Sequence, residues 1–369
     1  MKILHIGKSY PLDGGVEKVM YEIVQGISER NINCDMLCAA GEKAGIVTLN
    51  EYARIFCAKS YGKFAATFIS PEMIWQLKRI SNNYDIVHVH HPDPMACLAL
   101  FLSGYKGKVI LHWHSDILKQ KTLLKLYKPL QNWLINRADA IVGTTPVYVQ
   151  QSPCLRQVQH KIDYIPIGVE PITPAEQQVQ EIRSKYAGKK IVYSLGRLVE
   201  YKGYEYLIEA ANYLNDDFVI LIGSNGHLKE KLQKQINDNG LQDKVYLLGR
   251  IPEEDMPAYF GACDVFCLSS VWKTEAFAIV QIEAMSCGKP VVATKIPESG
   301  VSWVNKDGYS GLNVEIKNGK ALAEAIMKIT SDTENYKQYC TQAKERYETC
   351  FTRSKMTDRC LFLYNQILK

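Results

Sequence analysis

Short apolar runs alternate with amphipathic stretches from one end of the chain to the other. Residues 2–7 form a short apolar run typical of a buried strand, whereas residues 16–30 repeat apolar positions at helical spacing. Apolar runs at 84–90, 108–114 and 139–145 continue the alternation, with helical stretches between them. Strands that alternate with helices predict an α/β fold, in which helices cover both faces of a parallel sheet.

The alternation is interrupted at residues 164–174, where three prolines surround Gly168. Prolines at this density favour an extended connector. The alternation restarts at residues 190–196, and a chain of 369 residues is longer than one ordinary core supports. We therefore predict two doubly wound domains, 1–170 and 171–350, with ligands bound in a cleft between the carboxyl ends of their strands.

The composition indicates a globular protein, with 47% hydrophobic and 22% charged residues. No apolar run reaches eighteen residues, and the apolar run at the start is too short for a signal peptide. The eleven cysteines include no Cys-x-x-Cys pair and lie largely among hydrophobic residues, which favours buried thiols in a reducing compartment. The expected location is the cytoplasm, either free or peripheral on the inner face of the plasma membrane.

One segment is basic without acidic neighbours. The cations between Asp116 and Asp139 are Lys119, Lys121, Lys125, Lys128 and Arg137. They are interleaved with leucines and Trp133, as in a helix that lies on anionic lipid. The alternative is a surface helix with an ordinary solvated face.

Two carboxylates, Glu275 and Glu283, stand eight positions apart in the apolar stretch 273–294. If a helix begins at Ala276, Glu283 lies about 12 Å beyond Glu275. This separation suits contact with a sugar at one end and a ribose at the other, because carboxylates accept hydrogen bonds from vicinal hydroxyls. Alternatively, Glu275 is only an N-terminal charge and Glu283 faces solvent, although an unpaired buried carboxylate would be costly.

Two other groups suit an anion. Gly14 and Gly15 open the first helix and expose backbone amides at its positive end, although a simple tight turn explains them equally well. Arg197 follows the strand 190–196, and Lys202 comes five positions later. A strand-end arginine with a loop lysine can neutralise a diphosphate.

Five of the eight histidines are concentrated in two short segments: His88, His90, His91, His112 and His114. Alternate residues of a strand share a face, so His88 pairs with His90 and His112 with His114. A metal-dependent hydrolase that uses His88, His90 and His114 is one interpretation. The His-x-His-x-Asp-His order of such enzymes is absent, and so is an Asp-x-Asp pair to hold Mg²⁺ or Mn²⁺. We expect most of these rings to satisfy buried hydrogen bonds, and His114 to be functional.

The motifs together resemble glycosyltransferase family 4, whose members are retaining enzymes with the GT-B fold. The resemblance covers nearly the whole chain and is carried by GGVEKV, GRLVEYKG, VYLLGRI, EAMSCGKPVVAT and the Glu-x7-Glu spacing of Glu275 and Glu283. It implies two Rossmann-like domains that face each other across a cleft, the first on the acceptor side and the second binding the nucleotide sugar. It also implies that a last helix, within residues 351–369, crosses back to the first domain.

The resemblance assigns roles to individual residues. Arg197 and Lys202 would stabilise the leaving diphosphate without metal, Glu275 would bind the sugar and Glu283 the ribose. The catalytic set would be His114, Arg197, Lys202 and Glu275. The donor-binding set would be Gly14, Gly15, Arg197, Lys202, Arg250, Ile251, Glu275, Ala276, Phe277, Ala278 and Glu283. The family often has glycine where this chain has Ala278, which bears on how closely the backbone meets phosphate.

The function implied is transfer of mannose or a related hexose from a nucleotide-diphosphate sugar to a lipid-linked or oligosaccharide acceptor in bacterial surface polysaccharide synthesis, including lipopolysaccharide. Retention would follow from front-side displacement, in which the departing phosphate deprotonates the acceptor. No metal, other cofactor or nucleic-acid partner is expected, and the oligomeric state stays open. Three alternatives remain: a nucleotide-sugar epimerase on the same fold, the metal-dependent hydrolase, and a non-catalytic nucleotide-sugar-binding protein.

Overall fold

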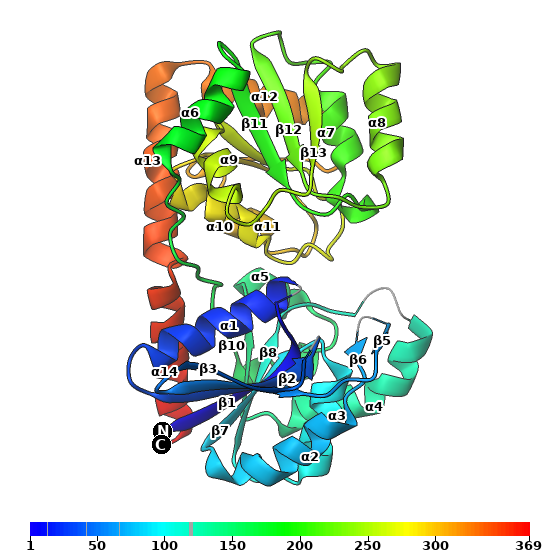
Figure 1. The fold of residues 1–369 in the computed structure, drawn as a ribbon, viewed down its shortest axis with the longest axis vertical. Helices are drawn as coiled ribbons and strands as arrows, with labels where there is room; N and C mark the ends of the chain where they lie inside the picture. The colour runs from blue at the N-terminus through cyan, green and yellow to red at the C-terminus, as the bar shows by residue number, and fades with distance from the viewer. Residues whose placement is uncertain (13, 42, 66, 118–120) are drawn as a thin grey trace. The chain divides into compact units, whose positions relative to one another are not determined.

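The computed structural model describes residues 1–369 except 13, 42, 66 and 118–120, and for 121 and 122 only the backbone. The chain forms two compact units, Met1–Gly168 with Arg353–Lys369, and Val169–Thr352 (Figure 1). The boundaries predicted from the sequence lie close by, after residues 170 and 350. Each unit is an α/β domain of the Rossmann type, built around its own sheet.

The first unit has an eight-stranded sheet in the order β10-β9-β8-β7-β1-β2-β4-β3. Its strands are β1 (Lys2–Tyr10), β2 (Asn33–Ala40), β3 (Gly45–Asn50), β4 (Ala53–Ala58), β7 (Ile86–His91), β8 (Lys108–Trp113), β9 (Ala140–Gly143) and β10 (Ile162–Tyr164), with a separate hairpin of β5 (Lys63–Phe64) and β6 (Thr67–Phe68). All pairs in the large sheet are parallel except β3 with β4. The expectation of a purely parallel sheet is therefore wrong at this edge, where a two-residue turn can join only antiparallel strands.

Helices cover both faces of this sheet. They are α1 (Gly15–Ser28), α2 (Pro71–Ile80), α3 (Pro94–Ser103), α4 (Lys121–Arg137), α5 (Pro146–Gln151) and α14 (Arg353–Ile367). Figure 1 shows α1 and α14 on one face and α2 and α3 on the other. Because both faces are covered, β7 is buried along its whole length, although three of its six residues are histidines.

The second unit has a six-stranded parallel sheet in the order β13-β12-β11-β14-β15-β16. Its strands are β11 (Lys190–Leu195), β12 (Phe218–Gly223), β13 (Val245–Gly249), β14 (Val265–Leu268), β15 (Val291–Thr294) and β16 (Gly311–Val314). Its helices are α6 (Glu176–Lys185), α7 (Tyr204–Ala210), α8 (Lys229–Asp238), α9 (Met256–Ala262), α10 (Ile279–Ser286), α11 (Val301–Val304), α12 (Gly319–Thr330) and α13 (Thr333–Cys350). The strand order reverses between β11 and β14, and in such sheets ligands bind outside the carboxyl ends of the strands at this point.

The last helix, α14, packs against α1 in the first unit. Gly26 of α1 lets the two helices approach, because a Cβ there would lie 2.2 Å from the hydroxyl of Thr357. Arg30 forms an ion pair with Asp358 at 2.5 Å. The first unit is thus completed by a segment that is remote in the sequence.

Candidate functional site

A buried ion pair lies at the point where the order of the second sheet reverses. Lys202 belongs to a short 3₁₀ turn, Glu200–Lys202, that follows β11, and Glu275 belongs to the loop that follows β14. The ammonium of Lys202 donates to Oε2 of Glu275 at 2.5 Å, and both side chains are about 90% buried. The hydroxyl of Ser270 donates to the same oxygen at 2.9 Å. The structure therefore brings together two of the residues predicted for the site.

Only one oxygen of the Glu275 carboxylate accepts hydrogen bonds from the described residues. No residue in the described part of the chain donates a hydrogen bond to Oε1 of Glu275, whereas Oε2 accepts from Lys202 and Ser270. The backbone carbonyl of Glu275 is also fixed, by the hydroxyl of Ser299. A carboxylate oriented in this way can accept a hydrogen bond from a ligand hydroxyl through Oε1.

The loop that carries Lys202 is fastened to the end of β14 by backbone contacts. Ser269 donates through its hydroxyl to the carbonyl of Lys202 at 2.9 Å, and the amide of Val271 donates to the carbonyl of Tyr201 at 2.8 Å. Gly203 is required between them: its φ is +62°, and a Cβ would lie 2.3 Å from the carbonyl oxygen of Ser269. The lysine is thus placed by backbone geometry before any ligand arrives.

The buried charge of Lys202 is stabilised by pairing. Burial by itself would lower the pKa of Lys202, but the Glu275 carboxylate more than offsets burial, so the pKa of Lys202 lies above its ordinary value. The lysine is therefore a permanent cation at neutral pH. It lies against Gly196, where a Cβ would come within 2.9 Å of its Cε, so this glycine makes room for the charge.

Arg197 follows Gly196 at the end of β11 and is exposed. It forms no ion pair with any residue that the structure describes. Together, Arg197 and Lys202 place an exposed and a buried cation after the same strand, where they can bind an anionic ligand.

The helix after Glu275 begins later than predicted. The sequence suggested a start at Ala276, but α10 starts at Ile279, because Ala278 has φ +62° and cannot continue a right-handed helix. Ala276, Phe277 and Ala278 therefore lie in the loop before α10, and the estimate of 12 Å along one helix does not apply. Glu283 does lie on α10 and is 9% exposed, which rules out the solvent-facing alternative.

A second group of side chains surrounds Gly223 at the end of β12. A Cβ on Gly223 would lie 2.5 Å from Cδ1 of Ile251 and 3.2 Å from the hydroxyl of Tyr193. The Tyr193 hydroxyl is buried and has no hydrogen-bond partner among the described residues. Its pKa is raised well above the ordinary value, first by burial and also by neighbours that include Glu283. Ile251 and the Tyr193 hydroxyl thus both lie close to Gly223, whereas Arg250 is exposed.

Sequence reasoning missed Tyr193, Ser270 and Ser299. Serine and tyrosine are common in strands and loops, and only the tertiary contacts show that Ser270 and Ser299 fix Glu275. Nothing in the sequence indicates that the Tyr193 hydroxyl is buried without a hydrogen-bond partner among the described residues.

The predicted histidine cluster is present in the first unit, with one member exchanged. The rings of His88, His90, His112 and His114 stack across β7 and the end of β8, with neighbouring centroids 4.1–5.3 Å apart. His5 of β1, which the sequence analysis left out, joins them through a hydrogen bond to His90 at 2.8 Å. His91 is not part of the cluster, because it points to the opposite face.

His91 stacks on Trp113, with centroids 3.7 Å apart, and contacts Gln131 of α4. Successive residues of a strand point to opposite faces of the sheet, so the side chains of His90 and His91 lie on opposite faces.

Burial keeps these imidazoles neutral. It lowers the pKa of His5, His91 and His112 to about 3, and it lowers the pKa of His88, His90 and His114 well below the ordinary value, with smaller contributions from neighbouring charges.

Two sets of three histidines have nitrogens close enough to share a metal ion: His5, His88 and His90, and His90, His112 and His114. The rings of the second set are nearly parallel, with interplanar angles of 9–23°. In each set two nitrogens lie at hydrogen-bond distance: His5 Nδ1 is 2.8 Å from His90 Nε2, and His90 Nδ1 is 2.8 Å from His114 Nε2. Hydrogen bonding describes this cluster better than ligation.

Gly14 and Gly15 are exposed and begin α1, after β1. Gly14 is extended, with φ −169°, so its conformation does not itself require glycine. These residues lie in the first unit, and Lys202 and Glu275 lie in the second.

The basic segment is only partly available to a partner. Lys119 lies outside the described residues, as does the side chain of Lys121. Lys128 donates to Gln131, and Arg137 donates to the carbonyls of Tyr105 and Gly107.

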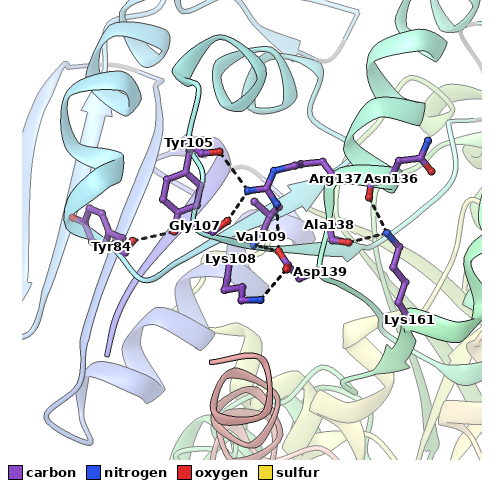
Figure 2. Close-up of polar contacts among 10 residues, drawn as sticks. All are labelled: Tyr84, Tyr105, Gly107, Lys108, Val109, Asn136, Arg137, Ala138, Asp139 and Lys161. Carbon is purple, nitrogen blue, oxygen red and sulfur yellow. Dashed lines mark hydrogen bonds and ion pairs between the residues drawn. The ribbon is translucent and has the colours of Figure 1, made fainter. Parts of the chain in front are cut away.

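Figure 2 shows that Arg137 belongs to a network centred on Asp139, which ties α4 to the starts of β8 and β9. Lys108 completes the network with an ion pair to Asp139 at 3.2 Å. Among the described cations of the segment, Lys125 is exposed, beside Leu126, which is 79% exposed. Among all the residues that the structure describes, no helix is long and apolar enough to cross a membrane.

Known glycosyltransferases match this protein over nearly its full length. Residues 13–172 match the description "Glycosyltransferase Family 4", and residues 176–346 match "Glycosyl transferases group 1". The chain is 30% identical to O-antigen chain mannosyltransferase C of Escherichia coli, covering 100% of this chain and 99% of that protein. It is 28% identical to D-rhamnosyltransferase WbpZ of Pseudomonas aeruginosa, covering 95% and 92%.

Among solved structures, Anabaena Alr3699/HepE in complex with UDP-glucose superimposes with a TM-score of 0.78 at 19% identity, covering 99% of this chain and 100% of that one. This likeness shows the fold, which is GT-B with two Rossmann-like domains. The full-length match to the mannosyltransferase at 30% identity shows more, and the chain therefore belongs to glycosyltransferase family 4 and is a glycosyltransferase.

Proposed function

We propose that the chain is a retaining hexosyltransferase that moves mannose or a mannose-like sugar from a nucleotide diphosphate to a lipid-linked or oligosaccharide acceptor, in the synthesis of a bacterial surface polysaccharide. The observation that carries the proposal is the buried Lys202–Glu275 pair at the reversal point of the second sheet. The two full-length relatives are named for mannose and D-rhamnose, and D-rhamnose is 6-deoxymannose. The named roles of relatives in O-antigen and lipopolysaccharide core synthesis support the acceptor class.

The chemistry proposed is a front-side displacement. The bond between the sugar C1 and the diphosphate oxygen breaks, and the acceptor oxygen bonds to C1 on the same face. The acceptor proton passes to the departing phosphate oxygen. Lys202 and Arg197 stabilise the charge that develops on that phosphate, and Glu275 accepts a hydrogen bond from the sugar through Oε1.

The remaining assignments complete the donor site. Glu283 would bind the ribose, with Ile251 and the backbone at Arg250 beside the base. His114 would lie beside the transferred sugar, and the amides at Gly14 and Gly15 would approach the phosphates. We expect no metal, because Arg197 and Lys202 would supply the positive charge that meets the diphosphate.

The donor and the reaction can be tested together. GDP-mannose, UDP-glucose, UDP-N-acetylglucosamine and UDP-galactose are compared by thermal shift and by transfer to an acceptor oligosaccharide, with and without EDTA. We expect one donor to stabilise the protein and to give an α-linked product with EDTA present. Product formed only with added metal, sugar isomerised without acceptor, or sugar released to water would contradict the proposal and favour the hydrolase or the epimerase.

We also propose that the enzyme works in the cytoplasm, at the inner face of the membrane, through the exposed part of α4. Leu123 and Leu126 are exposed beside Lys125, the combination that binds an anionic interface. The eleven free thiols fit a reducing compartment.

The double variant Lys125→Glu with Leu126→Glu should reduce sedimentation with anionic vesicles, more at low salt than at high salt. Lys231→Glu, on an exposed face of the second unit, is the matched control for charge alone. Equal sedimentation of the double variant and the wild type would remove the membrane contact from the proposal.

A further inference from the structure

An unbroken chain of hydrogen bonds runs through the interior of the first unit and ends at His114. His114 Nε2 lies 2.8 Å from His90 Nδ1, and His90 Nε2 lies 2.8 Å from His5 Nδ1. His5 Nε2 lies 3.3 Å from the hydroxyl of Tyr364 on α14, which in turn lies 2.7 Å from Nδ1 of His88. The chain therefore links the last helix of the protein to the end of β8.

Such a chain has only two proton arrangements. A neutral imidazole carries one donor nitrogen and one acceptor nitrogen. Both nitrogens of His5 and both nitrogens of His90 are used within the chain, so each ring must donate in the same direction as its neighbour. The direction set at Tyr364 is transmitted ring by ring and fixes which nitrogen of His114 carries hydrogen.

The distances at Tyr364 favour one direction. A contact of 2.7 Å to His88 fits a hydroxyl that donates, whereas 3.3 Å to His5 fits a long bond that the hydroxyl oxygen accepts. His5 then donates through Nε2, His90 through Nε2, and His114 through Nε2. This leaves Nδ1 of His114 without hydrogen, as an acceptor.

Burial keeps the arrangement intact. All five members are at most 5% exposed, so water does not compete for their nitrogens. An imidazolium would put hydrogen on both nitrogens and break the one-way order, and the lowered pKa values of these histidines exclude it at neutral pH. His112 stacks on His114 with ring centroids 4.1 Å apart, but neither of its nitrogens forms a hydrogen bond to a described residue. His112 is therefore not a member of the hydrogen-bond chain.

We infer that His5, His90 and Tyr364 are positioning residues that hold the ring of His114 in its Nε2–H tautomer and present a bare Nδ1 to a hydroxyl of the bound substrate. The part of this inference that concerns substrate rests on the proposed function, in which His114 lies beside the transferred sugar. The tautomer itself is a property of the free protein and can be measured without any substrate.

The first measurement is nitrogen NMR of the full chain labelled with ¹⁵N-histidine, in which protonated and bare ring nitrogens are well separated. A His114→Asn sample identifies the His114 signals. In the wild type we expect a bare Nδ1 and a protonated Nε2 on His114. In Tyr364→Phe, which removes only the hydroxyl that sets the direction, we expect the two tautomers of His114 to mix.

His112→Phe is the matched control, because it keeps an aromatic ring in the same stack and removes no member of the chain. Its His114 signals should match those of the wild type, and thermal melting should show that both variants are folded. In the transfer assay, Tyr364→Phe should lower kcat by about three- to tenfold with little change in the donor KM.

Three results would overturn the inference: a His114 with hydrogen on Nδ1, an unchanged tautomer in Tyr364→Phe, or a stoichiometric transition metal whose removal shifts the His90 and His114 signals. If the tautomer behaves as expected but His114→Asn transfers sugar at the normal rate, the hydrogen-bond chain is confirmed and the proposed role of His114 in transfer is wrong.

Discussion

The Lys202–Glu275 pair of the second unit and the histidine cluster of the first unit bury ionisable side chains in opposite ways. In the second unit, Lys202 and Glu275 stay charged, because each supplies the other's counter-charge at 2.5 Å. In the first unit, five stacked imidazoles stay neutral and share hydrogen bonds or go without them. The difference is one of chemistry, because a charge is retained in the interior only with a partner, whereas imidazole gives up its proton instead.

Acidification should give the largest effect that tests this contrast. A histidine whose pKa is lowered by folding destabilises the native state once the pH falls below its unfolded pKa of about 6.5, since the unfolded chain then binds protons that the native chain cannot. His5, His91 and His112, with pKa about 3, each lower the stability of the native state by roughly 1.4 kcal/mol per pH unit between about pH 6.5 and 3. From these three histidines we expect the free energy of unfolding of the first unit to fall by roughly 6 kcal/mol by pH 5. The lowered pKa values of His88, His90 and His114 add to this loss.

Hydrogen exchange followed by mass spectrometry can assign this loss, because the second unit holds a single histidine, His227, which is exposed. Protection should fall in β1, β7 and β8 before it falls in β11 and β14. Simultaneous loss in both sheets would break the comparison.

The second test removes one charge of the pair. Lys202→Ala should lower turnover about 100-fold or more, because the leaving diphosphate loses a fixed cation. It should also cost about 3 kcal/mol of unfolding free energy, since Glu275 is left buried without its partner.

Lys273→Ala is the matched control. Lys273 pairs with Glu298 at 2.7 Å in the same region, but Glu298 is half exposed, so we expect a loss below about 1 kcal/mol and turnover within a few fold of the wild type. Similar losses in the two variants, measured by urea denaturation and steady-state kinetics, would mean that burial does not distinguish the pairs.

A smaller effect should come from the backbone that places the lysine. Gly203→Ala introduces a Cβ at φ +62° and 2.3 Å from the carbonyl of Ser269, and we expect a loss of about 2 kcal/mol together with lower turnover. Gly240→Ala has φ +65° but no atom within 4 Å, so it should cost only about 1 kcal/mol and leave turnover unchanged. Equal stability of the two variants would show that the close approach at Ser269 is not tight in solution.

The smallest effect concerns the unused hydroxyl of Tyr193. Tyr193→Phe removes a buried polar group that bonds to no described residue, so the unfolding free energy should stay the same or rise by up to about 1 kcal/mol. A measured loss of more than 1 kcal/mol in urea denaturation would show that the hydroxyl has a partner in the folded protein.

Much of the architecture could be read from the chain. The runs at 84–90 and 108–114 are strands β7 and β8, and the last helix expected within residues 351–369 is α14. The antiparallel β3 was not found, because edge strands carry weak apolar patterns. The start of α10 was placed too early, because no rule of propensity anticipates an alanine at φ +62°.

What the sequence determined by itself is the order of elements and the residue types at the site, because hydrophobic periodicity and the chemistry of glutamate, lysine and histidine are local properties. It also placed Lys202 and Glu275 in one function through a family resemblance. Only the tertiary structure decided that these two side chains meet, that Ser270 shares their oxygen, and that His5 and Tyr364, 359 positions apart, lie in one hydrogen-bond chain with His90 and His114. Those facts depend on which strands become neighbours, and strand order is set by the packing of the whole sheet rather than by any one segment.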